Sequence, residues 1–255
     1  MRWWQLKQGI RTSLQKIGLD VTTCRRGGFP YDFDDGHVEI IKRVKPFTMT
    51  SNERLFGLIE SVRYIVKADI AGDFVECGVY KGGSIMAIAL ALIRENCSHR
   101  NLYLYDTFCG MTEPTEVDVD FHGQHPTKWA EWAIAPMAEV KAAVHSTGYP
   151  PERVHFVKGR VEDTLPAHAP KAICLLRLDT DWYESTRHEL VHLFPRLSPG
   201  GVLIADDYGQ YRGSRKAVDE YFSENGVPVL LHRMDFSGRI CVKPLDPKRS
   251  WQLSS

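Results

Sequence analysis

The chain has 255 residues, of which 43% are hydrophobic and 25% are charged, as in ordinary globular domains. Lysine plus arginine equals aspartate plus glutamate at 32 each, and this balance argues against a dedicated nucleic-acid-binding protein. No stretch approaches the roughly 18 consecutive apolar residues that a transmembrane helix requires. We therefore expect one large α/β domain or two small ones, with no nucleic-acid partner.

Residues 1–50 predict an N-terminal extension of helix and loop. The extension opens with the basic, aromatic sequence MRWWQLKQGIR, which lacks the apolar core of a signal peptide. Such a segment packs as a helix on the domain or on another subunit, or it contacts a membrane surface. We expect packing, and with it a homo-oligomer, and we keep membrane contact as the alternative. The glycine- and aspartate-rich stretch from Cys24 to His37 predicts a loop.

The cysteine pattern gives no sign of a disulfide framework or a zinc site. No two cysteines form a C-x-x-C pair, and none stands at zinc-ligand spacing from histidine. A chain of this length buries a full core without such cross-links. We therefore expect reduced thiols and a cytoplasmic location. The six cysteines are Cys24, Cys77, Cys97, Cys109, Cys174 and Cys241.

From residue 51 onward, strand patterns alternate with helix patterns. Apolar residues at helical spacing follow Ser51, and three further helices are predicted at Ser84–Arg94, Tyr183–Phe194 and Ser214–Phe222. Short apolar runs predict strands at Asp73–Val79, Leu102–Phe108, Val154–Gly159, Ile173–Asp179 and Val202–Asp207. Val227–Met234 and Gly238–Pro244 predict a closing antiparallel hairpin. This alternation predicts a doubly wound, mostly parallel sheet, on which ligands bind beyond the carboxyl ends of the strands.

Residues 109–135 contain glycine, proline, histidine and tryptophan without a clear period. A long irregular segment inside a compact domain is usually functional, so we expect a lid over the site. Its candidates for an acceptor pocket are His122, His125, Lys128, Trp129 and Trp132. The alternative is that Trp129 and Trp132, three residues apart, belong to a helix core.

A glycine-containing turn follows the first predicted strand. Gly78, Gly82 and Gly83 let the backbone turn tightly and approach a ligand, but their spacing matches neither the dinucleotide fingerprint nor a Walker A loop. Glu76 disfavours a pyrophosphate and suits a cationic ligand such as S-adenosylmethionine. Asp106 ends the next strand, where an acidic residue binds ribose hydroxyls in nucleotide-binding sheets. The alternatives are a purely structural turn and a helix cap.

Two aspartate pairs follow two later strands. Asp179 and Asp181 follow the fourth predicted strand, while Asp206 and Asp207 end the fifth. Four carboxylates at neighbouring strand ends repel one another unless a cation neutralises them, and oxygen ligands suit Mg²⁺ or Mn²⁺. N-capping of the following helices is the alternative, although a cap requires one aspartate and not a pair.

The motifs described above, together with the sequence around them, resemble the macrocin O-methyltransferase (TylF-like) family. The resemblance extends from about Arg43 to Cys241 and is carried by six segments. Any one of the matching segments alone is weakly specific, and their joint occurrence in this order is highly specific. They are TMTSNERL (Thr48–Leu55), GDFVECGVYKGGS (Gly72–Ser84), YDTFCGM (Tyr105–Met111), GRVEDTLP (Gly159–Pro166), LLRLDTDWYEST (Leu175–Thr186) and LSPGGVLIADDYG (Leu197–Gly209).

The resemblance implies a methyltransferase domain over residues 51–255 with the class I S-adenosylmethionine-dependent fold, a Rossmann-like α/β sheet of seven strands. It implies S-adenosylmethionine as donor, Mg²⁺ or Mn²⁺ as metal, and a hydroxyl of a sugar or glycosylated natural product as acceptor, expected within a vicinal diol. Two other roles stay open: methylation of a cell-surface glycan or lipid-linked saccharide, and S-adenosylmethionine binding without catalysis.

The resemblance also implies a role for each site residue. Asp179, Asp206 and Asp207 correspond to metal ligands, and Asp181 corresponds to the general base. The implied cofactor contacts are Thr48, Met49, Glu76, Gly78, Ser84, Asp106, Gly159, Asp163 and Asp179. The resemblance leads us to expect an aromatic residue near Val161, and this chain lacks one there. The resemblance therefore does not identify the residue that packs against the adenine of the cofactor at this position.

Overall fold

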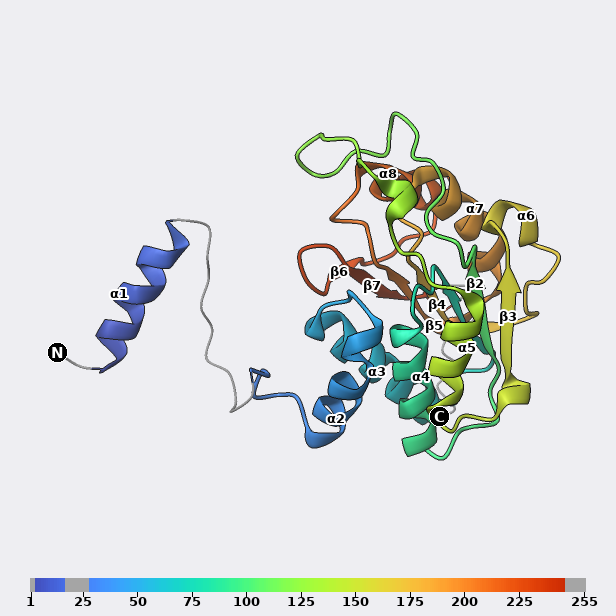
Figure 1. Cartoon of the computed structure of the whole chain (residues 1–255), viewed down its shortest axis with the longest axis horizontal. Helices are drawn as coiled ribbons and strands as arrows, with labels where there is room; N and C mark the ends of the chain where they lie inside the picture. Colours follow the sequence, from blue (N-terminus) through green and yellow to red (C-terminus); the bar gives the residue numbers. More distant parts are fainter. Residues whose placement is uncertain (1–2, 17–27, 246–255) are drawn as a thin grey trace, which may run out of the picture. The chain divides into compact units, whose positions relative to one another are not determined.

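The computed structural model describes residues 3–16 and 28–245, drawn in colour in Figure 1. The chain forms two compact units, Met1–Val38 and Glu39–Ser255, each described here by itself. None of the helices in the described ranges combines the length and the apolar character that a membrane span requires. The cysteines in these ranges are all free thiols, and Cys24 lies outside them.

The smaller unit contains helix α1 (Trp3–Gln15) and the start of helix α2 (Asp35–Val44). The predicted loop from Cys24 to His37 therefore ends earlier than expected, at Asp34. The backbone N–H of His37 donates to the Asp34 carboxylate at 2.8 Å, and the Asp34 N–H donates to Nδ1 of His37 at 3.2 Å. This reciprocal pair satisfies backbone donors at the helix start, as an N-cap does.

Residues 39–50, expected in the extension, belong to the larger unit. The 3-10 helix η1 (Lys45–Phe47) packs against helix α4 (Gly83–Arg94). A Cβ atom on Gly83 would lie only 2.8 Å from the Phe47 carbonyl oxygen and 2.6 Å from Cβ of Thr48. Glycine at this position therefore lets the segment ahead of helix α3 (Asn52–Lys67) pass directly over the start of α4.

A seven-stranded sheet with the strand order β3-β2-β1-β4-β5-β7-β6 forms the centre of the larger unit (Figure 1). Its strands are β1 (Asp73–Cys77), β2 (Leu102–Asp106), β3 (Val154–Lys158), β4 (Ile173–Leu178), β5 (Leu197–Ala205), β6 (His232–Arg233) and β7 (Arg239–Val242). Strands β1 to β5 pair in parallel, and β7 runs antiparallel to both of its neighbours. The predicted α/β class, with its closing antiparallel hairpin, is confirmed.

Helices cover both faces of this sheet. Helix α4 packs between α3 and α5 (Met137–His145), while α7 (Tyr183–Leu193) packs against α6 (Val161–Thr164) and α8 (Arg212–Glu224). Val75 and Cys77 face the α7–α8 side, in one hydrophobic cluster with Leu190 and Phe222. Because side chains alternate along a strand, Glu76 points to the opposite face.

The closing hairpin is shorter than predicted. Only His232 and Arg233 pair with β7, although the sequence predicts a strand from residue 227. Val227, Val229 and Leu231 still pack in alternation against the core, which explains the strand-like pattern. Helices α5 and α6 form in stretches where the sequence pattern predicts no regular structure.

Candidate active site

The parallel register brings three strand ends to one edge of the sheet. Cys77 of β1 pairs with Leu178 of β4, and Leu178 pairs with Ala205 of β5. The next residue of each strand, namely Gly78, Asp179 and Asp206, therefore emerges at the same level. The register therefore brings residues that are far apart in the sequence together in one site.

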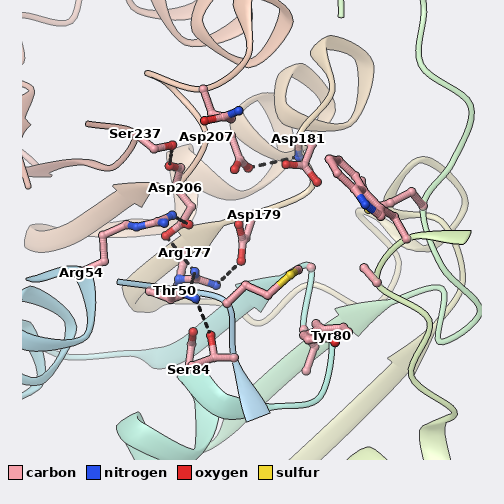
Figure 2. Close-up of a pocket in the computed structure, with 18 of the residues that line it drawn as sticks. Thr50, Arg54, Tyr80, Ser84, Arg177, Asp179, Asp181, Asp206, Asp207 and Ser237 are labelled. Carbon is pink, nitrogen blue, oxygen red and sulfur yellow. Dashed lines mark hydrogen bonds and ion pairs between the residues drawn. The ribbon is translucent and has the colours of Figure 1, made fainter. Parts of the chain in front are cut away.

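Three aspartates gather at this edge, as Figure 2 shows. Asp179, Asp206 and Asp207 each offer a carboxylate oxygen, and these oxygens lie within 4.8 Å of one another. Asp206 and Asp207 are buried, while Asp179 is partly exposed to the cavity. A compact set of carboxylate oxygens is the donor set that hard divalent cations prefer.

Two arginines, neither predicted from the sequence as a site residue, share these carboxylates (Figure 2). Arg177 of β4 is buried beneath the cluster and contacts Asp179 and Asp206 at 2.7 Å each, and Glu76 at 2.6 Å. Its guanidinium also donates to Oγ1 of Thr50 at 3.1 Å. Arg177 thus joins the ends of β1, β4 and β5 to the segment before α3.

The second arginine comes from helix α3. Arg54 pairs with Asp206 and, through Nε, with Asp235 of the β6–β7 turn at 3.0 Å. Ser51 caps α3 by accepting from the Arg54 N–H, and its hydroxyl donates to the same Asp235 carboxylate at 2.6 Å. The start of α3, the hairpin turn and the end of β5 are therefore tied together.

The cluster nevertheless holds more acid than base. Arg54 and Arg177 form ion pairs with Glu76, Asp179, Asp206 and Asp235, and the carboxyl groups of Asp181 and Asp207 interact with the same cluster. Oδ1 of Asp206 is buried and forms an ion pair with Arg177 at 2.7 Å, but it accepts no hydrogen bond among the described residues. The donor set and this unsatisfied oxygen both fit a divalent cation.

The pKa values of these carboxyl groups reflect their enclosure. Burial, followed by repulsion from Asp179, raises the pKa of Asp181 to about 8. Burial and the neighbouring charge of Asp206 raise the pKa of Asp179 to about 7, against the opposing effect of Arg177. Burial also raises the pKa of Glu76 to about 8. Without a cation, the site therefore retains protons that exposed carboxyl groups release.

Asp181 lies in a tight loop between β4 and α7. Its φ of 65° is in the left-handed region, which is uncommon for a residue with a side chain. The backbone N–H of Asp181 donates to Asp207 at 3.2 Å, and the Thr180 hydroxyl donates to the buried Glu189 at 3.0 Å. The N–H of Trp182 donates to the Thr180 carbonyl at 2.8 Å. These contacts hold Asp181 beside the three-aspartate cluster in a strained conformation.

The cluster forms one wall of a cavity of about 330 Å³, and Figure 2 draws most of the residues that line it. This size lies within the range of ligand pockets, roughly 300–1,000 Å³. Most of the predicted site residues line it: Thr48, Met49, Gly78, Ser84, Asp106, Asp179, Asp181, Asp206 and Asp207. A smaller, neighbouring cavity of about 60 Å³ shares Gly78, Asp106 and Asp179 and also contains Gly159.

Gly78 and Asp106 shape the turn between these cavities. Gly78 has a φ of 81°, and a Cβ atom there would lie 1.9 Å from the Asp179 carbonyl oxygen. The Asp106 carboxylate accepts from the N–H groups of Val79 at 2.7 Å, Tyr80 at 3.0 Å and Phe108 at 2.6 Å. Asp106 therefore fixes the glycine turn while it lines both cavities.

Two of the predicted cofactor contacts, Glu76 and Asp163, line neither cavity. Glu76 lines neither cavity, because it is buried under Arg177 on the α3 face of the sheet. Asp163 is exposed and lines neither cavity, whereas Glu162 lines the smaller one. Adjacent residues of a helical turn point in different directions, which is why Glu162 reaches the smaller cavity and Asp163 does not.

The irregular segment after β2 is anchored at its base. Asp118 is fully buried, and its carboxylate accepts from the N–H of Tyr183, the first residue of α7, at 2.7 Å. The indole of Trp182 donates to the Thr112 carbonyl at 2.9 Å, and Asp120 forms an isolated bridge with Tyr211. This part of the chain therefore runs along the starts of α7 and α8.

Of the acceptor-pocket candidates in this segment, only Trp132 lines the larger cavity. His122, His125 and Lys128 are exposed and line neither cavity, and Trp129 is partly buried. Trp132 follows the 3-10 helix η2 (Trp129–Glu131) and is 46% exposed, so it is not a helix core residue.

The chain is similar to the proteins of one known family. A family model described as Macrocin-O-methyltransferase (TylF) matches residues 42–242. A Streptomyces olivaceus protein, the 8-demethyl-8-(2,3-dimethoxy-α-L-rhamnosyl)-tetracenomycin-C 4'-O-methyltransferase, is 33% identical over 199 residues, covering 75% of this chain and 73% of its own length. The mycinamicin III 3''-O-methyltransferase of Micromonospora griseorubida is 30% identical over 194 residues, covering 75% and 76%.

Solved structures show the same fold. The O-methyltransferase NovP superposes with a TM-score of 0.69 at 27% identity, covering 78% of this chain and 83% of that protein. The calicheamicin methyltransferase CalS11 superposes with a TM-score of 0.63 at 18% identity, covering 88% and 98%. The fold of the larger unit thus also occurs in proteins that are named as methyltransferases.

Proposed function

Because the chain belongs to the macrocin O-methyltransferase (TylF) family, and is accordingly an S-adenosylmethionine-dependent O-methyltransferase, we propose that it methylates a sugar hydroxyl of a glycosylated natural product with the help of a divalent cation. The single observation that supports the metal most strongly is the convergence of Asp179, Asp206 and Asp207 on the wall of the larger cavity. These three residues would hold Mg²⁺ or Mn²⁺.

We assign the residues that line the two cavities to the methyl donor or to the methyl acceptor. Thr48, Met49, Gly78 and Ser84 line the larger cavity near the turn after β1, where they would enclose the methionyl part of S-adenosylmethionine. Asp106 lies between the two cavities and would bind the ribose, while the smaller cavity around Gly159 would take the adenine. Glu76 would act on this site through Arg177 and not by direct contact.

Asp181 is the proposed general base. It lines the same cavity and lies beside the three-aspartate cluster without belonging to it. When bound, S-adenosylmethionine supplies an electrophilic methyl group and the cation lowers the pKa of a hydroxyl beside it. Asp181 would accept the hydroxyl proton, and the cavity walls would hold the acceptor oxygen in line for transfer.

The printed names of the curated relatives support a sugar as the acceptor. The Streptomyces olivaceus relative is named for the 4'-O-methylation of a rhamnosyl-bearing tetracenomycin, and the Micromonospora relative for the 3''-O-methylation of mycinamicin III. We propose a sugar of the same general kind here, presented with the reacting hydroxyl and a neighbouring hydroxyl toward the aspartates. The segment over residues 109–135 would cover the acceptor as a lid.

A methyl-transfer assay with labelled S-adenosylmethionine and a panel of glycosides tests this proposal. We expect turnover that EDTA abolishes and Mg²⁺ restores. Asp181→Asn is expected to lower kcat by about 10²–10⁴-fold while S-adenosylmethionine binding stays unchanged in calorimetry. Asp69→Asn, on a surface aspartate whose side chain is 99% exposed, is the matched control. Tight cofactor binding without transfer to any glycoside would instead indicate a non-catalytic binding protein.

A further inference from the structure

Three arginines outside the two cavities gather around the ring of Tyr208. Tyr208 follows Asp207 in the loop after β5 and lines neither cavity. The guanidinium carbons of Arg215, from α8, and Arg239, from β7, lie 5.3 Å and 5.0 Å from the centroid of its ring. Arg233 of β6 is the cross-strand partner of Arg239. We call Arg215, Arg233 and Arg239 the arginine cluster.

The positive charges of this cluster repel one another. Residues directly opposite in an antiparallel pair present their side chains on one face, and like charges at such positions destabilise the pair. Burial, followed by repulsion from Arg233, lowers the pKa of Arg239 from its ordinary value, and Arg215 lowers this pKa further. An anion bound by the cluster would remove this repulsion, so the arrangement favours an anionic ligand.

Backbone carbonyl groups, and not carboxylates, hold two of the three arginines. Arg239 donates to the carbonyl oxygens of Ser237 at 3.3 Å and Gly238 at 2.9 Å, and Arg233 donates through Nε to the Asp235 carbonyl at 2.7 Å. Neither arginine forms an ion pair with a carboxylate within the described ranges of the chain. Both therefore keep an uncompensated charge and further N–H donors that a ligand can engage.

Two aspartates lie near the cluster, and one of them is committed elsewhere. Asp219 of α8 accepts from the Tyr208 hydroxyl at 2.8 Å, and its other oxygen lies 3.7 Å from Nε of Arg215. The Asp235 carboxylate pairs with Arg54 at 3.0 Å. Three positive charges therefore face one available carboxylate, although the chain as a whole has no net charge.

From these contacts we infer that the arginine cluster is a binding site for a phosphoryl group, separate from the three-aspartate cluster. Guanidinium groups match phosphate oxygens with paired hydrogen bonds, and several positive charges suit a group that carries more than one negative charge. Gln210, two residues after Tyr208, and Phe236, in the β6–β7 turn, line the larger cavity. The phosphoryl group therefore comes either from the acceptor, a source that rests on the proposed function, or from a free phosphate ligand.

Calorimetry with inorganic pyrophosphate tests the site without methyl transfer. EDTA in the buffer removes divalent cations, so no metal on the aspartates holds the probe. We expect saturable binding at one site by the full chain, with Kd at least about tenfold higher in Arg233→Gln and in Arg215→Gln, because each variant loses a charge-assisted contact. Arg153→Gln is the matched control, since Arg153, in the 3-10 helix η3 (Pro151–Arg153), is exposed and lines neither cavity.

Melting temperatures separate loss of the site from loss of the fold. Because Arg233→Gln removes one of two opposed like charges, the melting temperature of the metal-free variant should stay equal to that of the unaltered chain or rise. Pyrophosphate should raise the melting temperature of the unaltered chain and leave that of Arg233→Gln unchanged. If Arg233→Gln does not fold, Arg215→Gln, on a different element, gives the same comparison.

Acceptors with and without phosphate distinguish the two sources of the phosphoryl group. For each sugar that is methylated with labelled S-adenosylmethionine and Mg²⁺, the KM of the glycosyl 1-phosphate is compared with the KM of the methyl glycoside. A lower KM for the phosphate form, lost in Arg233→Gln, assigns the group to the acceptor. Equal KM values, with pyrophosphate binding intact, assign it to a free ligand.

Failure of this inference and failure of the proposed function have different signatures. Absence of pyrophosphate binding by the unaltered chain, or equal binding by Arg233→Gln and Arg153→Gln, would overturn the inference and leave the proposed function standing. Absence of methyl transfer to every sugar would overturn the proposed function and leave the calorimetric result in place.

Discussion

Arg177 is the residue on which the site most depends. It is buried and contacts Glu76, Asp179 and Asp206, so its removal leaves buried carboxyl groups without a cation. Removing one partner of a buried ion pair typically costs several kcal/mol, more than the intact pair contributes relative to an apolar pair. The arginine therefore determines whether the aspartates can lie this close together.

We predict that Arg177→Met lowers the unfolding free energy by about 3–5 kcal/mol, measured by urea denaturation without added metal. The double variant Arg177→Met/Glu76→Gln should recover part of this loss, because it removes the carboxyl group that Arg177 contacts on β1. Arg94→Met, at an exposed surface pair, is the control. Equal stability of Arg177→Met and Arg94→Met would show that the network does not depend on Arg177.

Glu189 holds the loop that carries Asp181. Burial raises the pKa of Glu189 well above its ordinary value, and its carboxyl group accepts a hydrogen bond from the Thr180 hydroxyl at 3.0 Å. We predict that Glu189→Ala lowers kcat about tenfold or more, because misplaced reacting groups cost rate steeply. S-adenosylmethionine affinity should not change, and Glu189→Gln, which keeps an acceptor oxygen, should restore kcat. If Glu189→Gln is as slow as Glu189→Ala, this positioning role is wrong.

The sequence predicts which aspartates meet, but it leaves the arginines out. The strand-end pattern places two aspartate pairs, Asp179 with Asp181 and Asp206 with Asp207, at one edge because parallel register does so in any such sheet, whereas the family resemblance is what separates Asp181 from the other three. Arg177 carries a usable signal, since a single arginine inside an apolar strand needs buried partners. No sequence signal marks Arg54 as a site residue, because its contact with Asp235 depends on how the hairpin turn returns to the start of α3.

At the scale of elements, the turn after β1 and the loop after β4 form one contact. A Cβ atom on Gly78 would overlap the Asp179 carbonyl at 1.9 Å, so the glycine is needed for packing as well as for approach to a ligand. We predict that Gly78→Ala lowers the unfolding free energy more than Gly148→Ala does. Gly148 has a similar φ of 84° with open space around it, and it measures the conformational strain alone. Equal losses of unfolding free energy in the two variants would show that the close approach of Gly78 to Asp179 does not contribute to stability.

The predicted elements agree with the structure where the sequence pattern is long and periodic. They differ where the length of a strand depends on pairing with a neighbouring strand. Val227–Met234 has strand character, yet only His232 and Arg233 find a partner on β7. The base of the segment after β2 is held by Asp118 and Trp182, through contacts with α7 and Thr112 that no local pattern predicts. Its role as a lid stays a prediction.

At the scale of the whole molecule, the raised pKa values have a consequence for stability. Glu76 and Asp181 have pKa values of about 8, raised from their ordinary values of 4.5 and 3.8. The folded protein therefore holds these protons at pH values where the unfolded chain has released them. The contribution of these two carboxyl groups to the stability of the fold is fully present below about pH 4 and is lost as the pH rises toward about 8.

We accordingly predict that the melting temperature of the metal-free protein falls between about pH 6 and pH 8, measured by calorimetry. Because a cation replaces protons as the neutralising charge, Mg²⁺ should raise the melting temperature more at the higher pH. Asp181→Asn should reduce the pH dependence. A Mg²⁺ effect that is equal at both pH values, or larger at the lower one, would contradict this assignment of charge.

The N-terminal helix bears on assembly. Leu6 and Ile10 of α1 are exposed and lie one turn apart on the helix, so together they form an apolar surface. We predict that the full chain is a homo-oligomer and that deletion of residues 1–15 lowers its mass in light scattering. An unchanged mass, with loss of binding to anionic vesicles on deletion, would instead assign this helix to a membrane surface.

The central claim is that Asp179, Asp206 and Asp207 hold one divalent cation beside the proposed cofactor cavity. Titration with Mn²⁺, followed by electron paramagnetic resonance of the free ion, tests it without requiring the acceptor. We predict one Mn²⁺ bound per chain in the unaltered protein and in the surface control Asp69→Asn, with affinity at least about tenfold weaker in Asp207→Asn. Equal Mn²⁺ binding by Asp207→Asn and Asp69→Asn would contradict the account.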